Sequence, residues 1–276
     1  PLTLYLVDHG DPEKVYLDLP TGEWVTPAQI DTWLTQLETA RPGVKVNVIV
    51  EACHAGSFIY LPQTISKPGR VVLTSTGASN LAYASTHGAI FSDHFVAALA
   101  QGQSLYLAFQ SARWATESAF PHQTPWLDDN GNGISNEVSD GQEAALRGFA
   151  YPGTLSGAQW PPYIVQALGP TTMTQGQGVI HAEVRDDEHV KRVWAAVYPP
   201  SYRPPETGAE LIYDSPFTMT LVTQGDNWYT ATYTGFTEIG EYRLVIFAED
   251  DNDWAARPMP LEVRVSWMVY LPLVLK

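Results

Sequence analysis

Residues 44–57 read Val-Lys-Val-Asn-Val-Ile-Val-Glu-Ala-Cys-His-Ala-Gly-Ser, an apolar run that leads into a polar turn. The run follows the chain-reversing pair Pro42-Gly43 and is rich in β-branched residues. Such a run predicts a buried strand over residues 44–50. Cys53, the single cysteine of the chain, therefore lies just beyond the carboxyl end of a strand.

The first half of the chain alternates strands of this kind with helices. We predict strands over Leu2–Val7, Val15–Leu19, Val44–Val50 and Arg70–Ser75. A capping-box signal, Thr26 with Pro27 and Gln29, predicts a helix that ends near Pro42. Ser92 and Ser104 are the predicted N-caps of two further helices. This alternation predicts an α/β fold over residues 1–150, with a mostly parallel sheet and helices on both faces.

The second half of the chain has a different pattern. Residues 151–162 are rich in Gly, Pro and Ser and are predicted to form a linker. Over residues 163–267, short alternating stretches are separated by turn signals and show no helical period, which predicts about seven strands in an all-β, immunoglobulin-like sandwich. Residues 268–276 are apolar and are predicted to be a last strand or a C-terminal tail.

Composition narrows the function classes. The formal charge of -15 argues against a nucleic-acid partner, because such proteins carry a basic surface. No run approaches the roughly 20 apolar residues of a membrane-spanning helix. These features, and a tail that resembles those of secreted bacterial proteins, predict a secreted or cell-surface location in a bacterium. Because the chain begins directly on a strand, we expect an N-terminally incomplete domain, with the missing N-terminal segment of its own precursor as a candidate partner.

A second strand end completes a candidate catalytic pair. The strand Leu2–Val7 runs into Asp8-His9-Gly10. Ligands of open α/β sheets bind beyond the carboxyl ends of the strands, so His9 and Cys53 are expected in one crevice if the two strands are neighbours. An imidazole beside a thiol acts as its general base and acid. The Gly10 and Cys53 N–H groups are candidate oxyanion donors. The structural alternative is a buried core thiol.

These residues resemble a known enzyme family. Glu51-Ala52-Cys53 followed by Gly56-Ser57, with His9-Gly10 44 positions earlier, is similar to the caspase-like clan of cysteine peptidases, and closest to its legumain (asparaginyl endopeptidase) family. The resemblance covers roughly residues 1–120 and implies a caspase-like sheet. It also implies that Cys53 is the nucleophile and His9 the base.

The same resemblance extends to substrate recognition. Thr74-Ser75-Thr76 and Ser92-Asp93 are similar to stretches around the specificity pocket of legumain-like enzymes. It implies that Glu51, Asp93 and Ser75 bind substrate. The pocket Arg of the clan lies upstream of the His and is not in this sequence. The resemblance to legumain implies Asn or Asp as the residue preceding the cleaved bond (P1), whereas the two carboxylates Glu51 and Asp93 would equally favour Arg or Lys.

The function that follows is a cysteine endopeptidase that hydrolyses polypeptides through a thioacyl-enzyme and requires no cofactor for catalysis. Two alternatives stay open. One is a catalytically inactive adhesion or binding protein on a peptidase fold, and the other is a Cys-dependent transpeptidase or ligase.

A separate motif predicts a calcium site. Residues 128–133 read Asp-Asp-Asn-Gly-Asn-Gly, which places oxygen ligands and a Gly as in the start of an EF-hand loop. The predicted ligands are Asp128, Asn130, Asn132, Ile134 and Asn136. Position 12 of the loop is Ser139 rather than Glu, so Glu137 or Asp140 would have to supply the last ligand. The alternative is a polar turn without metal.

Overall fold

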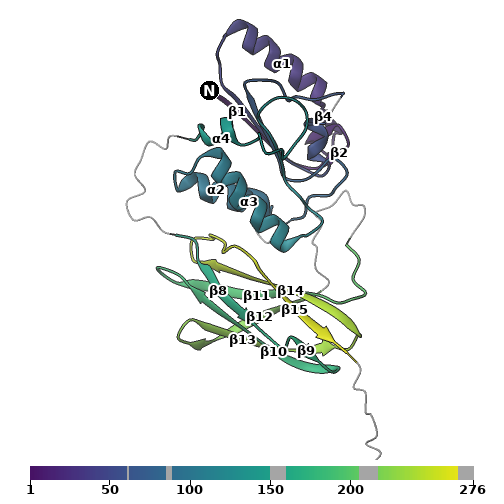
Figure 1. The fold of residues 1–276 in the computed structure, drawn as a ribbon, viewed down its shortest axis with the longest axis vertical. Helices are drawn as coiled ribbons and strands as arrows, with labels where there is room; N and C mark the ends of the chain where they lie inside the picture. The colour runs from purple at the N-terminus through teal and green to yellow at the C-terminus, as the bar shows by residue number, and fades with distance from the viewer. Residues whose placement is uncertain (61, 85–88, 150–159, 205–216, 267–276) are drawn as a thin grey trace, which may run out of the picture. The chain divides into compact units, whose positions relative to one another are not determined.

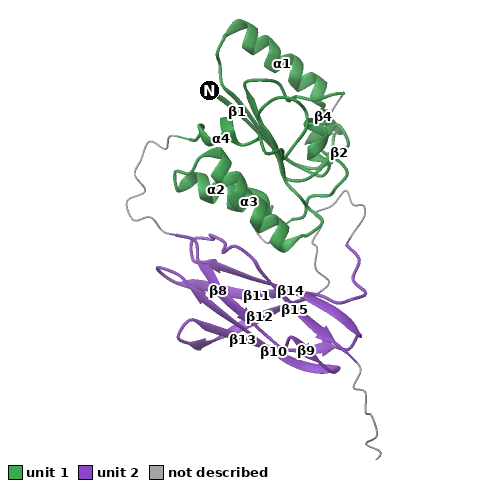
Figure 2. Cartoon of the chain, in the orientation of Figure 1, with its two compact units in different colours: residues 1–158, 205–214 green, residues 159–204, 215–276 purple. Residues whose placement is uncertain are grey.

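The structure is a computed structural model that describes residues 1–60, 62–84, 89–149, 160–204 and 217–266. The described residues up to 149 form one compact unit, unit 1, and those from 160 onward form a second, unit 2 (Figures 1 and 2). Within these residues, no helix is both long and apolar enough to cross a membrane. The predicted linker lies outside the described residues, apart from 160–162, and so does the predicted tail.

Unit 1 is built on a four-stranded sheet. Its strands are β1 (Leu2–Val7), β5 (Val46–Glu51), β6 (Arg70–Thr74) and β7 (Trp126–Asp128), in the order β1-β5-β6-β7. The first three are parallel and β7 is antiparallel to β6. A small antiparallel sheet follows β1 and contains β2 (Gly10–Asp11), β3 (Lys14–Asp18) and β4 (Glu23–Val25). The parallel order makes β1 and β5 neighbours, which is the arrangement that the candidate site requires.

Helices lie on both faces of this sheet because side chains along each strand point alternately to opposite sides. On one side, Val48 and its same-face neighbours pack against Ile30 and Leu34 of α1 (Pro27–Ala40). On the other, Ile49 and Leu73 pack against α2 (Ile90–Ala100) and α3 (Leu105–Ala119). Two short helices, η1 (Ala55–Phe58) and α4 (Gln142–Ala145), complete unit 1. The mixed α/β fold predicted from the sequence is thus confirmed.

The helix ends test the predicted caps. Thr26 caps α1 with both bonds of a capping box, as predicted, and Ser104 accepts a bond from the Leu107 N–H at the start of α3. The predicted cap at Ser92 is wrong, because the N-cap of α2 is Ala89, three residues earlier, and the helix begins at Ile90. The Ser92 hydroxyl instead donates to the Glu51 carboxylate, so a tertiary partner has taken the place of a backbone N–H.

Unit 2 is a two-layered all-β structure. Its strands are β8 (Tyr163–Leu168), β9 (Thr172–Met173), β10 (Gly176–Arg185), β11 (Val190–Tyr198), β12 (Thr218–Gly225), β13 (Trp228–Phe236), β14 (Gly240–Asp250) and β15 (Met259–Val265). They are ordered β8-β10-β13-β12-β11-β14-β15-β9, and all pairs but β9–β15 are antiparallel. The first half of β12 pairs with β11 and its second half with β13, so this strand passes from one layer to the other.

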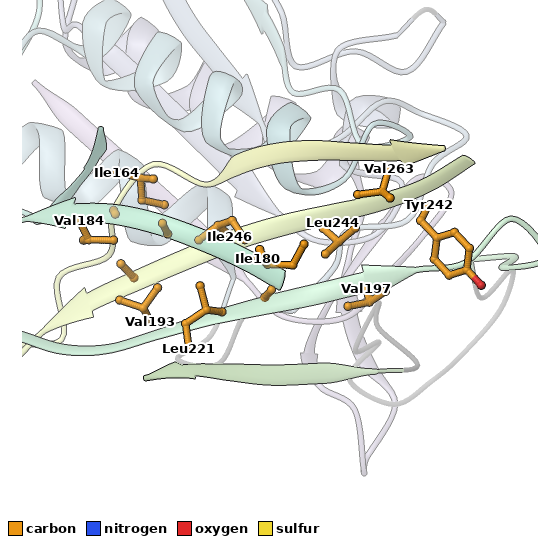
Figure 3. Packing of buried hydrophobic residues seen from close by; sticks show 14 of the residues in the cluster. Ile164, Ile180, Val184, Val193, Val197, Leu221, Tyr242, Leu244, Ile246 and Val263 are labelled. Atoms are coloured by element: carbon orange, nitrogen blue, oxygen red, sulfur yellow. The ribbon is translucent and has the colours of Figure 1, made fainter. Parts of the chain in front are cut away.

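The core of unit 2 lies between these layers. Side chains from both layers meet there, among them Ile180 of β10, Val193 of β11 and Leu244 of β14 (Figure 3). The Tyr242 side chain is fully buried at the edge of this core. Its hydroxyl accepts N–H bonds from Thr237 and Glu238 and donates to the Gly235 carbonyl. This tyrosine corner ties the β13–β14 connection to the core, as in sandwiches of immunoglobulin type.

Candidate active site

The ends of β1 and β5 meet at one edge of the main sheet of unit 1. Val7 is paired with Glu51, and the Asp8 N–H donates to the Glu51 carbonyl at 3.2 Å, which extends the ladder by one residue. Beyond that point, a Cβ atom on Gly10 would lie 2.2 Å from the Cys53 carbonyl oxygen. The backbone of the His9-Gly10 pair therefore passes directly against the Cys53 turn, and only glycine fits at position 10.

Cys53 is a free, half-buried thiol held by one neighbouring segment. The Ala82 N–H points at Cys53 Sγ at 3.4 Å, and the thiol lies 3.7 Å from the Ala82 carbonyl oxygen. Burial raises the pKa of the Cys53 thiol, the Ala82 N–H lowers it, and the nearby negative charge of Asp11 raises it further. Since the net effect is a raised pKa, a neighbouring base is needed to produce the thiolate near neutral pH.

Two histidines lie close to Cys53 in sequence or in space, and their backbones are held differently. The His9 N–H donates to Asp8 Oδ1 at 2.6 Å and its carbonyl accepts from the Tyr16 N–H, which fixes the residue before Gly10. His54 has a left-handed backbone, with φ of 60°. Its Nδ1 lies 3.1 Å from the Ala78 carbonyl, so one nitrogen of this ring is occupied by a loop contact. This leaves His9 as the better base candidate.

Gly56 and Ser57, which follow Cys53 in the motif, pack against neighbouring loops and bond to them. Gly56 leaves no room for a side chain, because a Cβ there would lie 2.5 Å from the Ala78 nitrogen and 2.7 Å from the Trp126 ring. The Ser57 hydroxyl, which is buried, accepts the Glu13 N–H at 2.9 Å. These contacts hold the Cys53 turn between the loop that follows β2 and the loop that follows β6.

Glu51 lies two residues before Cys53, with its side chain 3% exposed. One carboxylate oxygen, Oε2, accepts the Ser92 hydroxyl, and Ser92 Oγ is also hydrogen-bonded to the Tyr5 hydroxyl. The other oxygen, Oε1, is buried and has no hydrogen-bond partner in the described part of the chain. Burial raises the pKa of Glu51 to about 7, with the Ser92 hydrogen bond acting in the opposite direction.

The two other predicted substrate residues lie beside Glu51. Ser75 follows β6, and its buried hydroxyl also lacks a hydrogen-bond partner within the described ranges. It nevertheless lies close enough to Glu51 to lower the pKa of the carboxyl slightly. Asp93 is in the first turn of α2, and its negative charge contributes to the raised pKa values of Glu51 and Tyr5. The structure therefore brings Glu51, Ser75 and Asp93 together.

Some of the residues around this site could not have been found from the sequence. Tyr5 and the Ser92 hydroxyl join the cluster through tertiary contacts between β1, α2 and β5. Ala82 and Asp11 also influence the Cys53 thiol, Ala82 from the loop after β6 and Asp11 from the end of β2. The alternation of β1 places Tyr5 on the same face as Val7, but nothing in that pattern distinguishes its hydroxyl from an ordinary strand side chain.

The predicted calcium loop is closed by its own hydrogen bonds. The two Asp128 oxygens accept the N–H groups of Gly131 and Gly133 at 2.8 and 2.7 Å. Asn130 and Asn132 accept N–H groups two residues further on in the same way. No group of three or more His, Cys, Asp or Glu side chains in the described ranges is arranged to hold a metal ion. These contacts are those of a self-stabilised Asp/Asn turn, and calcium binding stays a prediction.

Other side chains of that loop bond to neighbouring parts of unit 1. The carboxylate of Asp129 accepts the N–H groups of Gly141 and Ala144 and so caps α4. Asn136, with φ of 59°, donates to the Pro125 carbonyl and accepts from the Leu127 N–H. Burial raises the pKa of Asp140 to about 6, and the charges of the neighbouring aspartates add to this effect.

A comparison with known protein families finds a match within unit 1. Residues 1–118 match the model of the Peptidase C13 family, and the match includes both His9 and Cys53. No curated protein matches the chain. The matched segment covers every residue assigned above to the Cys53 turn and the Glu51 cluster except Trp126.

Solved structures with some similarity include single domains or modules of other proteins. The PKD domain of an M14-like peptidase from Thermoplasmatales archaeon SCGC AB-540-F20 is 18% identical, with 39% of this chain and 98% of that chain covered and a TM-score of 0.25. The fibronectin(III)-like modules of Clostridium thermocellum CbhA are 14% identical, with 39% and 47% covered and a TM-score of 0.26. TM-scores of this size do not establish a shared fold.

Proposed function

We propose that this protein is a cysteine endopeptidase in which Cys53 is the nucleophile and His9 the general base. The observation that supports this most directly is the packing of Gly10 against the Cys53 carbonyl, because it joins the two motif segments at the carboxyl ends of adjacent parallel strands. The match of residues 1–118 to a peptidase family supports the same chemistry.

The proposed reaction follows from the state of the thiol. Because burial raises the pKa of Cys53, His9 takes the thiol proton as Sγ attacks the peptide carbonyl carbon. The carbonyl oxygen becomes an oxyanion, which accepts hydrogen bonds from the N–H groups of Gly10 and Cys53. His9 then gives its proton to the leaving amine, and the C–N bond breaks to leave a thioester on Cys53. His9 next deprotonates a water that attacks the thioester, and the acid product and the thiol are released.

The P1 side chain is proposed to bind at Glu51, Ser75 and Asp93. A neutral Glu51 can share hydrogen bonds with Asn or Asp, whereas an ionised Glu51 beside Asp93 attracts Arg or Lys. The raised pKa of Glu51, about 7, makes both states accessible near neutrality. A P1 series with Asn, Asp, Arg and Lys, assayed from pH 5 to 9, distinguishes them.

The proposal is tested with Cys53→Ala. We expect the substitution to reduce peptide hydrolysis by at least about 1,000-fold, since the thioacyl step is lost. A peptidyl acyloxymethyl ketone should alkylate Cys53 in the wild-type protein, which mass spectrometry of the labelled peptide detects. Undiminished hydrolysis by Cys53→Ala would overturn the proposal. An inactive binding protein would show neither hydrolysis nor labelling, and a transpeptidase would transfer the acyl group to an added amine in preference to water.

A further inference from the structure

A short chain of hydroxyl groups ends at the Glu51 carboxylate. It runs from the Tyr5 hydroxyl to Ser92 Oγ and from there to Glu51 Oε2. The three residues come from β1, α2 and β5. The Tyr5 ring lies 6.4 Å from the Phe95 ring on the same helix as Ser92, which holds the tyrosine against α2.

This chain leaves Glu51 anchored by one oxygen only. Glu51 Oε1 and Ser75 Oγ are both buried and unpartnered among residues that the structure describes. An unsatisfied buried polar group costs about 1–3 kcal/mol, and more where the group is charged. Among the described residues, no hydrogen bond to Glu51 Oε1 or to Ser75 Oγ offsets this cost, although the Ser92 hydroxyl occupies Oε2 of the same carboxylate. Two such groups at adjacent strand ends indicate a site that is completed by a ligand.

We infer that Tyr5 and Ser92 are positioning residues for P1 recognition: Ser92 holds Glu51 Oε2 so that Oε1 faces the P1 side chain, and Tyr5 holds Ser92. The inference rests on the proposed endopeptidase function and deepens it. Since Oε1 is an acceptor and Asp93 adds a second acidic group, the P1 side chain that completes the site is one that donates N–H groups. Asn, Lys and Arg fit this requirement, and an apolar residue of equal length does not.

The test compares Ser92→Ala and Tyr5→Phe with matched controls in α3. Ser111 is half-buried and helical like Ser92, and Tyr106 is half-buried where Tyr5 is 37% exposed, so Ser111→Ala and Tyr106→Phe remove the same groups elsewhere. Each protein is assayed for kcat and KM on peptides that differ only at P1, with Asn, Lys, Arg or norleucine. Circular dichroism checks that each variant is folded.

We expect Ser92→Ala to raise KM about tenfold for the P1 residues that donate N–H groups. A tenfold change corresponds to the loss of about one hydrogen bond to a charged group. The KM for norleucine and the kcat values should change little. Tyr5→Phe should give a smaller rise of about threefold, since it acts through Ser92. Ser92→Thr, which keeps the hydroxyl, should restore the wild-type ratio. A P1 preference unchanged in both Ser92→Ala and Tyr5→Phe, in enzymes that still hydrolyse peptides, overturns the inference.

A second readout does not depend on activity. In the Cys53→Ala background, carbon-13 NMR of labelled glutamate follows the titration of Glu51. The Ser92 hydroxyl stabilises the carboxylate, so Ser92→Ala should move the Glu51 titration to higher pH, and Ser111→Ala should leave it in place. A titration that does not move overturns the inference. If the wild-type protein hydrolyses no peptide, the proposed function fails, and binding of a P1-Asn or P1-Lys peptide aldehyde then decides the inference by itself.

Discussion

Glu51 in unit 1 and Tyr242 in unit 2 are both polar side chains buried at the end of a strand or the edge of a core, but they are satisfied to different degrees. The Tyr242 hydroxyl makes three hydrogen bonds to backbone groups within seven residues. Glu51 uses one oxygen and leaves the other without a partner in the described parts of the chain. A buried group that serves stability is expected to be fully hydrogen-bonded, whereas one that awaits a ligand is not.

This difference in hydrogen bonding predicts which substitutions should change stability and which should change activity. Removing a satisfied group leaves its partners unpaired and destabilises the protein. Removing the charge from an unsatisfied group removes the free-energy cost of burying that charge. The substitution should therefore stabilise the protein while altering its function. Polar groups at the ends of β5 and β6 should therefore respond oppositely to the tyrosine corner.

The largest effect is expected from Gly10→Ala. The new Cβ would overlap the Cys53 carbonyl oxygen and the Ala52 side chain, so the backbone at position 10 must move. Overpacking of this kind costs about 1–3 kcal/mol or more, and a displacement of about 1 Å near reacting groups costs about 100-fold in rate. We expect peptide hydrolysis to fall by at least about 100-fold, measured as kcat/KM.

The control for this prediction is Gly148→Ala. Its added Cβ would approach no atom closer than 3.5 Å, so both activity and stability should stay near wild-type values. A Gly10→Ala protein with wild-type kcat/KM would contradict the close packing of the two motif segments.

The variant Glu51→Gln should be more stable than the wild type, and this difference in the free energy of unfolding of unit 1 should grow as the pH rises. The folded-state pKa of about 7 lies above the usual 4.5, so ionisation is penalised in the fold. In the wild type, stability is therefore lost as pH rises from about 4.5 to about 7, and the loss is complete above that range. The difference between the two pKa values corresponds to about 3 kcal/mol. Urea unfolding at several pH values measures it: above pH 7 the variant should be more stable, and its stability should change less between pH 4.5 and 7.

A loss of stability in Glu51→Gln would contradict the contrast drawn between Glu51 and Tyr242. If Glu51→Gln were destabilising at pH 8, the carboxylate would be a satisfied structural group like Tyr242. Asp18→Asn, a change of the same kind at a half-exposed strand position, controls for the general effect of removing one negative charge from an acidic protein.

Much of the fold follows from signals that are local in sequence. The capping box of Thr26 and the apolar runs of β1 and β5 each act over a few residues, so their elements could be predicted. The approach of the His9-Gly10 segment to the Cys53 turn could also be expected, because parallel neighbours end at the same edge. Strand β7 was not predicted, since three residues show no periodicity and its pairing with β6 is long-range.

The candidate site was predictable only in part, for a related reason. Glu51, Ser75 and Asp93 were found through a resemblance, whereas the contact of Tyr5 with Ser92 depends on where α2 packs. The mistaken cap at Ser92 shows the same limit. A serine near a helix start has two competing partners, the helix N–H groups and the Glu51 carboxylate, and only the tertiary structure decides between them.

Tyr242→Phe should destabilise unit 2 by about 1–3 kcal/mol, since the Glu238 N–H and the Gly235 carbonyl lose a buried partner. The ring itself stays, so packing in the core changes little. Urea unfolding monitored by tryptophan fluorescence measures the effect. Tyr229→Phe is the control, because Tyr229 packs against the same core without a comparable set of bonds. Equal stability of the two variants would show that the tyrosine corner adds nothing beyond packing.

The smallest effect, Thr26→Ala, tests whether unit 1 also contains satisfied groups that behave like Tyr242. The Thr26 hydroxyl accepts the Gln29 N–H, and the Gln29 side chain accepts the Thr26 N–H at 2.9 Å. Loss of such a cap costs about 1 kcal/mol. Because α1 packs on the sheet face opposite to α2, the substitution should lower the free energy of unfolding of unit 1 and leave kcat/KM and the P1 preference unchanged. Thr39→Ala, within the same helix, is the matched control. A change of P1 preference in Thr26→Ala would mean that the stability of unit 1 and the Glu51 site cannot be separated, and the contrast between Glu51 and Tyr242 would lose its functional meaning.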